Sequence, residues 1–267
     1  MSSEFVFTKE NLDMYLKELA KEIRKNNRSA IVTEIILIGG AAILANYGFR
    51  EMTTDIDAVF RAAFSLKDII NRVGDKFNLP NGWLNTEFVK TGSYSPRLVE
   101  ISKHYKTFAN VLEVRTVSAE YLIAMKLRAG RKYKNDLSDI IGILSEHEKM
   151  GIPITLNQID TAVQKLYDGW QDIPTDVRKF IEEVIRNGDY SEIYSAVRDS
   201  EKESKNILIR FEKDYPNVTN EENVDKILEN MKAKRAESTK ESVLEQLKNA
   251  QTSEKSKRCA HKEDIGL

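Results

Sequence analysis

The sequence predicts an α+β protein in which a small mixed sheet flanked by helices is followed by an all-helical C-terminal region. Short β-branched runs and helical patterns alternate between residues 30 and 117. After residue 118 only helical periodicity remains. We therefore divide the chain into a mixed domain (1–150), a helical region (151–247) and a polar, aperiodic tail (248–267) that we expect to be disordered.

Four short apolar runs are predicted to form the strands of the sheet, because they are rich in β-branched residues. They cover Thr33–Ile38, Asp55–Phe60, Arg97–Ser102 and Val111–Val117. Apolar residues at helical spacing predict the helices. The helices cover 8–26, 41–47, a stretch opening at Ser65, 118–129, 135–148, 156–168, 175–187 and 190–213, with one more starting at Thr219.

The composition excludes several classes of protein. The formal net charge of −1 over 267 residues gives no global attraction to nucleic acid, so any such contact needs a local basic patch. A single cysteine and three widely spaced histidines argue against a disulfide framework and a zinc cluster. The sequence has neither a membrane-spanning stretch nor a signal-peptide pattern, and we expect a cytoplasmic protein without a membrane partner.

Two neighbouring motifs indicate chemistry. Gly39 and Gly40 follow a predicted strand and open a small apolar helix. Without a Cβ they would let a phosphate approach the backbone at the helix N-terminus. Asp55 and Asp57 begin the next strand, and side chains two apart lie on one face of a strand. Such a pair could share Mg²⁺ or Mn²⁺, completed by water and phosphate oxygens. Alone, each motif more often marks a tight turn or a solvated cap, but together they indicate phosphoryl or nucleotidyl transfer.

These motifs resemble the signature of the nucleotidyltransferase fold shared with DNA polymerase beta. They are similar to a bacterial branch that includes AbiEii-like toxins. The matching elements are Gly39–Ala42, Gly48-Phe49-Arg50, Thr54-Asp55-Ile56-Asp57, Gly82-Trp83-Leu84-Asn85 and residues 119–140. The spacing departs from the pattern by an extra Thr53. The resemblance covers about residues 30–145 and is more specific for fold than for substrate.

A second cluster, AMKLRAGRKYKNDLSDI, carries five cations between residues 126 and 134. A solvated basic helix end is one interpretation. The other is that Lys126, flanked by Met125 and Leu127, reaches into a cleft and neutralises triphosphate charge. The resemblance implies that Lys126 is catalytic. It implies nucleotide-binding roles for Gly39, Gly40, Arg50, Thr54, Arg131, Asp136 and Asp139.

The resemblance also implies a third carboxylate on a neighbouring strand. Glu100 and Glu113 are the candidates, and we favour Glu100 because its apolar flanks are typical of a central strand. If neither faces the cleft, two-metal chemistry is in doubt. Trp83 is expected to anchor a loop on the core rather than to line the cleft.

The function predicted from these residues is metal-dependent transfer of a nucleoside monophosphate from an NTP to a hydroxyl. The acceptor would be RNA, as in toxin-like relatives that modify transfer RNA, or equally a protein side chain or a small molecule such as an antibiotic. An antitoxin is a possible partner, in a toxin–antitoxin or phage-defence system. The alternative is a non-catalytic nucleotide-binding or partner-binding module with a degenerate nucleotidyltransferase fold.

Overall fold

The computed structural model describes residues 5–26, 32–62, 65–220 and 223–235. The chain forms two compact units, Met1–Glu201 and Lys202–Leu267. The boundary expected near residue 150 falls inside the first unit, between two of its helices. The tail expected to be disordered, 248–267, lies outside the described residues.

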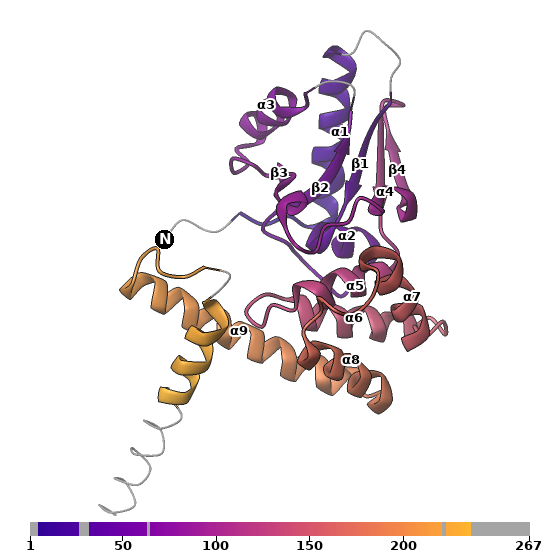
Figure 1. Ribbon diagram of the computed structural model, residues 1–267. Coiled ribbons are helices and arrows are strands. Elements are labelled where there is room, and N and C mark those ends of the chain that lie inside the picture. Colours follow the sequence, from indigo (N-terminus) through magenta and orange to yellow (C-terminus); the bar gives the residue numbers. More distant parts are fainter. Residues whose placement is uncertain (1–4, 27–31, 63–64, 221–222, 236–267) are drawn as a thin grey trace, which may run out of the picture. The chain divides into compact units, whose positions relative to one another are not determined.

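A five-stranded mixed sheet is the centre of the first unit (Figure 1). Its strand order is β3-β2-β1-β5-β4. The strands are β1 (Thr33–Leu37), β2 (Ile56–Arg61), β3 (Leu84–Asn85), β4 (Lys103–Phe108) and β5 (Leu112–Thr116). The central strand β1 pairs antiparallel with β2 and parallel with β5. Its residues Ile35, Ile36 and Leu37 are fully buried, as expected of a strand covered on both faces. The predicted mixed sheet flanked by helices is confirmed.

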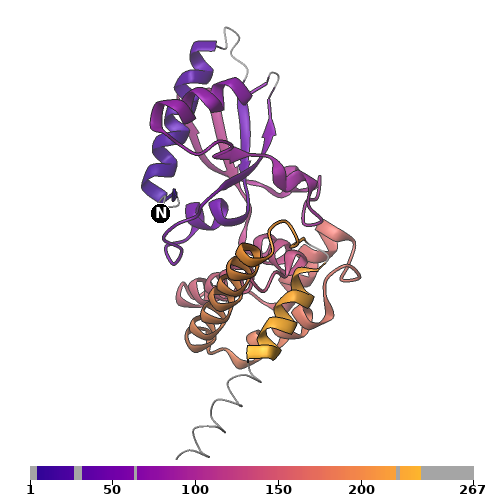
Figure 2. The same cartoon turned by 90° about the vertical axis from the view of Figure 1, so that its left-hand side faces the viewer.

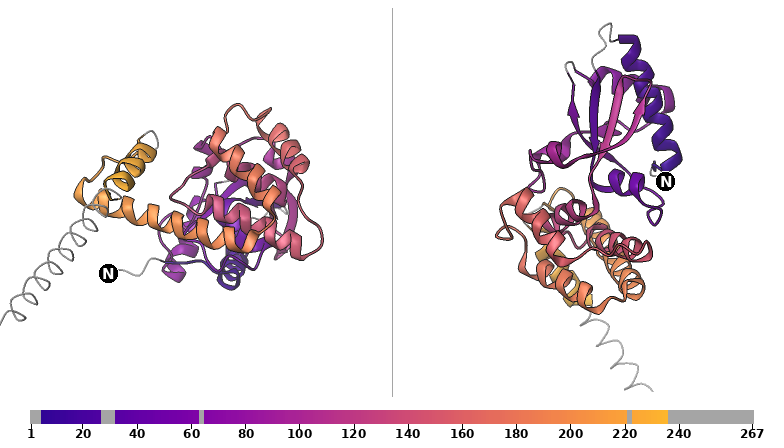
Figure 3. Two further views of the ribbon diagram at one scale, coloured as in Figure 1. Left: turned by 90° about the horizontal axis from the view of Figure 1, so that it is seen from below. Right: turned by 90° about the vertical axis from the view of Figure 1, so that its right-hand side faces the viewer.

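Helices surround the sheet and follow it. The first four are α1 (Lys9–Asn26), α2 (Gly39–Asn46), α3 (Lys67–Phe77) and α4 (Leu98–Ile101), with a 3₁₀ helix η1 at Glu87–Lys90. The rest are α5 (Ala119–Ala129), α6 (Asp136–Lys149), α7 (Leu156–Tyr167), α8 (Thr175–Asn187) and α9 (Tyr190–Asp214). Helices α1 and α3 pack together on one face of the sheet, and α5 to α8 gather beyond the end where β1 and β5 terminate (Figures 1, 2 and 3). Residues 224–235 are also helical.

One predicted strand is wrong. Within this run Leu98–Ile101 form α4 instead, because Ser95-Pro96 opens a helical turn in which the Leu98 amide donates to the Ser95 carbonyl at 3.1 Å. The strand comes directly afterwards, as β4 at the edge of the sheet. Its lysines and histidine are exposed, so it lacks the apolar alternation by which a strand is found in a sequence. Among the described residues, no helix is long and apolar enough to cross a membrane.

Candidate functional site

The double glycine opens α2 at the end of β1. Gly39 has φ +55°, a left-handed conformation that glycine adopts without strain. A Cβ on Gly40 would lie 2.6 Å from Thr53 Oγ1 and 2.9 Å from an Arg50 guanidinium nitrogen, so only glycine lets both side chains approach. No side chain caps this helix, and its first amides have no intrahelical acceptor. The end of α2 is therefore suited to bind an anion.

The aspartate pair lies beside this helix end because β2 runs next to β1. The Ile38 amide donates to the Asp57 carbonyl at 3.1 Å, and a Cβ on Gly39 would lie 3.7 Å from Asp57 Oδ2. Asp57 is half-buried, whereas Asp55 is exposed. Burial and the neighbouring charge of Asp55 raise the pKa of Asp57. The structure thus brings together the two motifs that the sequence singled out.

A compact charge network joins this region to α5 and α6. Lys126 Nζ lies 2.7 Å from Asp136 Oδ1 and 2.9 Å from Asp139 Oδ2. Arg131 Nε binds Asp136 Oδ2 at 2.7 Å, and Arg50 pairs with Asp139. The two aspartates are three residues apart and so share one face of α6. Three cations therefore surround two carboxylates, which leaves a net positive charge.

The network is buried and stays ionised. The side chain of Asp136 is 0% exposed and that of Lys126 11%. Burial by itself would raise the pKa of Asp136, but Lys126 and Arg131 outweigh it and hold this pKa well below its usual range. Burial would lower the pKa of Lys126, but Asp136 and Asp139 outweigh it and raise this pKa. These groups therefore provide fixed charge rather than a mobile proton.

Lys134 differs from the other cations of the basic run. Lys126 and Arg131 belong to the network, Arg128 pairs with Asp172 at 3.0 Å, and Lys132 pairs with Asp176 at 2.8 Å. Within the described part of the chain, Lys134 has no ion pair. It lies close enough to Asp57 for its charge to lower the pKa of that carboxyl, as does Arg131. In the sequence, nothing distinguishes Lys134 from its neighbours.

Glu201 is a second residue that the sequence did not indicate. It comes from α9, is 2% exposed, and its Oε1 accepts the Leu137 amide at 2.8 Å and the Ser138 amide at 3.4 Å. Its other oxygen accepts the Ser138 hydroxyl. Because Asn135 provides no side-chain cap, Glu201 satisfies the N-terminal amides of α6 from 63–64 residues away. It thereby fixes the turn that carries Asp136 and Asp139.

The Trp-Leu-Asn motif also reaches the site. Asn85 on β3 stands in register with Asp57, and its side-chain amide helps to lower the pKa of that carboxyl. Trp83 is 2% exposed and donates its indole N–H to the Ile70 carbonyl at 3.0 Å. Its expected role as a core anchor is confirmed. Of the two threonines, Thr53 reaches Asp55 at 3.4 Å, while Thr54 is exposed and its role stays a prediction.

Neither candidate third carboxylate lies beside Asp57. Glu100 is exposed on α4, not on a central strand. Glu113 is on β5 opposite Glu34. Glu34 precedes Ile38 by four residues, so Glu113 lies about 13 Å along the sheet from the strand end that carries the aspartates. On β5 the residue nearest the aspartates on their face is Arg115, which pairs with Glu113 at 3.2 Å. The described residues form no group of three or more potential metal ligands.

A divalent cation still fits the residues present. Asp55 and Asp57 provide two carboxylates whose mutual repulsion a cation would relieve, and Mg²⁺ accepts one or two carboxylates completed by water and substrate phosphates. The uncapped end of α2 is adjacent to Asp57 for those phosphates. The site is therefore organised for a metal-bound polyphosphate rather than for a metal held by protein groups alone.

Comparison with known proteins agrees with this geometry. Residues 14–146 match the model of a family described as a nucleotidyltransferase of unknown function (DUF6036). No curated protein and no solved structure gives a significant match. The matched segment contains the sheet, the double glycine, the aspartate pair and the charge network. The mixed sheet, the site and this match together support a nucleotidyltransferase family for the chain.

Proposed function

We propose that this protein transfers a nucleoside monophosphate from an NTP to an acceptor hydroxyl. The observation that carries the proposal is the meeting of Gly39 and Asp57 at one end of the sheet. A helix end suited to phosphate and a pair of carboxylates suited to a cation are what such a reaction needs. The match to a nucleotidyltransferase family supports the same reaction class.

In the reaction, the acceptor oxygen bonds to the α-phosphorus as the bond from that phosphorus to the bridging oxygen breaks. Pyrophosphate leaves and the hydroxyl proton passes to solvent. A divalent cation held by Asp55 and Asp57 would stabilise charge on the phosphates and lower the pKa of the hydroxyl. The amides at the start of α2 would hold the phosphate oxygens of the NTP.

The cations near Asp57 divide into two roles. Arg50 and Lys126 are committed to Asp139 and Asp136, so they keep the site positive without being free to follow the substrate. Arg131 is 38% exposed and Lys134 is unpaired among the described residues, so these two would contact the triphosphate and offset charge in the transition state. The lysine proposed to contact the triphosphate is therefore Lys134, and not Lys126 as the sequence suggested.

The proposed acceptor is RNA or a protein, and the proposed setting is a toxin–antitoxin or phage-defence system. The support for this setting is the resemblance of the motifs to AbiEii-like toxins. A second function remains a candidate: binding nucleotide without transfer. Neither Glu100 nor Glu113 lies beside Asp57 as a third carboxylate, which favours this alternative.

Transfer of label from α-³²P NTPs tests the proposal. Each NTP is incubated separately with Mg²⁺ or Mn²⁺, total cellular RNA and lysate protein. The inactive form is Asp55→Ala/Asp57→Ala, and the matched control is Asp68→Asn, an exposed carboxylate on α3. Label in RNA or in a protein band, lost in the double variant and kept in the control, supports transfer. No label with either metal, while the folded protein still binds NTP, refutes transfer and favours the binding module.

A further inference from the structure

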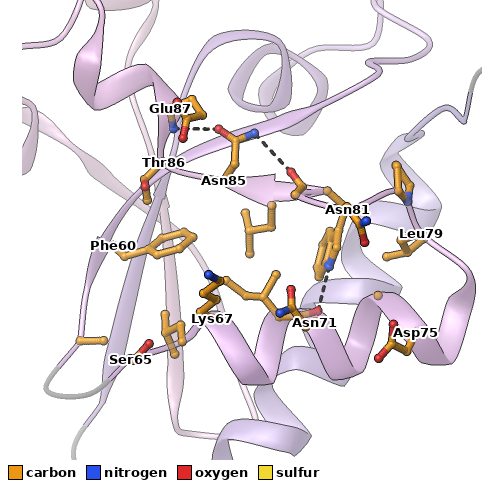
Figure 4. A pocket seen from close by; sticks show the side chains of 18 residues that line it. Phe60, Ser65, Lys67, Asn71, Asp75, Leu79, Asn81, Asn85, Thr86 and Glu87 are labelled. Atoms are coloured by element: carbon orange, nitrogen blue, oxygen red, sulfur yellow. Dashed lines mark hydrogen bonds between the residues drawn. The ribbon is translucent and has the colours of Figure 1, made fainter.

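A cavity of about 870 Å³ opens between β2, β3 and α3 (Figure 4). Its volume is in the range of small-molecule sites, about 300–1,000 Å³. None of the site residues predicted from the sequence lines it. The cavity is therefore a second feature of this unit that the proposed function has not used.

The inner wall of the cavity is apolar and fixed. Trp83, Leu84 and Ile70 are each at most 5% exposed. The indole N–H of Trp83 is bonded to the Ile70 carbonyl, and a Cβ on Gly74 would lie 3.3 Å from the indole Cδ1. Because this wall is held by the core, the cavity exists before a ligand binds.

Phe60 provides an aromatic face. It comes from β2 and is half-buried, and its ring lies at the cavity (Figure 4). It makes no ring contact with another aromatic residue in the described ranges. A free ring beside an apolar wall favours a flat ligand, because flat faces stack on aromatic rings.

The rim carries hydrogen-bonding groups that suit the edge of a heterocycle. Asn71 and Asn81 line the cavity, and their side-chain amides make no hydrogen bond within the described chain. A side-chain amide offers a donor and an acceptor in one plane, the pattern that pairs with a base edge. Lys67 is outweighed by Asp75 and Glu87, so the lining is negative and suits an uncharged group, while any phosphates of the ligand would lie outside the cavity. The favoured ligand is a neutral, flat heterocycle.

The position of the cavity bears on which bound molecule could supply the heterocycle. Phe60 and Ile56 lie on one face of β2 and Asp57 on the other. The cavity thus opens on the face of the sheet opposite the aspartates. The edge strand β3 has only two residues, and Asn85, which contacts Asp57, also lines the cavity. A nucleic-acid strand can pass round this short edge.

We propose that this cavity holds a nucleobase of a single-stranded RNA acceptor, next to the nucleotide that receives the NMP. The inference rests on the proposed transferase function and narrows its acceptor to RNA. The strand would stack one base on Phe60, pair its edge with Asn71 and Asn81, and present its terminal hydroxyl to Asp57 across the edge at Asn85. A protein acceptor would not need the cavity.

Binding of short oligonucleotides tests the inference without requiring transfer. The probes are four fluorescein-labelled hexaribonucleotides, each of a single base, and the host is the Asp57→Asn variant. In this host we expect one base to be preferred and Phe60→Leu to weaken its binding about 5- to 150-fold, the effect of removing one stacked base. The control is Phe88→Leu, a half-buried ring of η1 outside the cavity, with unchanged affinity. Asn71→Ala, an exposed change, gives a second weakened variant should Phe60→Leu not fold.

The outcomes separate this inference from the proposed function. If Phe60→Leu and Asn71→Ala bind every hexamer as the host does, or if no hexamer binds, the inference is wrong, whatever the transfer assay shows. If binding depends on Phe60 but the wild type transfers no label, the cavity stands as an RNA site and the transferase function fails. If label enters protein and no hexamer binds, the transferase stands and the RNA acceptor is excluded.

Discussion

Asp136→Asn tests whether the buried charge network holds α5 and α6 together. The substitution keeps the shape of the side chain and removes its charge. Lys126 and Arg131, each 2.7 Å from Asp136, then lose this partner, and Lys126 keeps only Asp139, which it shares with Arg50. Removing one partner of a buried pair costs about 3–5 kcal/mol, because the remaining charge stays buried without compensation. We expect Asp136→Asn to lower the free energy of unfolding by this amount.

The matched control is Asp172→Asn. Asp172 pairs with Arg128 at 3.0 Å, but its side chain is 60% exposed. An exposed pair contributes about 0–1 kcal/mol. Urea unfolding of the wild type and both variants, followed by circular dichroism at one pH and salt concentration, measures the difference. If Asp136→Asn costs no more than Asp172→Asn, the network does not stabilise the fold and our reasoning about it is wrong.

The same pair predicts a pH dependence. The pKa of Asp136 is depressed in the folded protein, so below the ordinary value of 3.8 the unfolded chain binds a proton that the folded one does not. The contribution of Asp136 is therefore fully present above that value and is lost as the pH falls below it. In Asp136→Asn this acid-dependent part of the loss should be absent. An unchanged acid dependence in the variant would contradict the assignment.

Three further predictions concern single residues around the site. Asp57→Asn should raise the melting temperature of the metal-free protein by about 2–4 °C, the shift given by ~1 kcal/mol, because it removes a half-buried charge beside Asp55. The same variant should no longer be stabilised by Mg²⁺ with NTP. A lower melting temperature of the metal-free variant would contradict the first expectation. Lys134→Ala should weaken NTP binding about 5- to 10-fold, as loss of one ionic contact predicts, with no change in melting temperature. The exposed control Lys179→Ala should change neither the affinity nor the melting temperature. Isothermal titration calorimetry measures the affinity of each variant for NTP. Burial raises the pKa of Glu201 to about 7, so the folded state keeps a proton that the unfolded chain loses near pH 4.5. The free energy of unfolding of the wild type should therefore fall as the pH rises from ~4.5 to 7. Glu201→Gln should remove this pH dependence when unfolding is measured across the same range.

Much of the site could be predicted because its parts are local in the sequence. The double glycine and the aspartate pair each adjoin a strand, and antiparallel pairing of β1 with β2 brings their ends together without further information. Helical spacing by itself puts Asp136 and Asp139, three residues apart, on one face of α6. For these residues the chemistry depends on neighbours a few positions away, which is the range over which a periodicity argument works.

The partners of the charges could not be predicted in the same way. Which of the basic residues between 126 and 134 remains unpaired depends on Asp172 and Asp176, which follow α7. The cap of α6 comes from Glu201, on α9. Glu100 was misplaced because a turn at Pro96 converts an apolar run into helix, and apolar flanks of that length suit either structure. Long-range partners and short ambiguous runs therefore set the limit of the sequence argument.

The site concentrates features that cost stability and that the described chain offsets only in part, through the charges of Arg131 and Lys134 near Asp57. Asp55 and Asp57 repel each other, and burial opposes the charge of Asp57. The helix that begins at Gly39 has no side-chain cap, and Lys134 has no ion pair among the described residues. A fold kept only as a scaffold gains nothing from placing an uncapped helix end, a repelling carboxylate pair and a free cation at one edge. A cation carried by a polyphosphate would relieve all three together. The charge of the cation would face the carboxylates, and the oxygens of the polyphosphate would face the helix amides and the lysine. Such cost is typical of a binding site, and it argues for a nucleotide here even though neither Glu100 nor Glu113 lies beside Asp57.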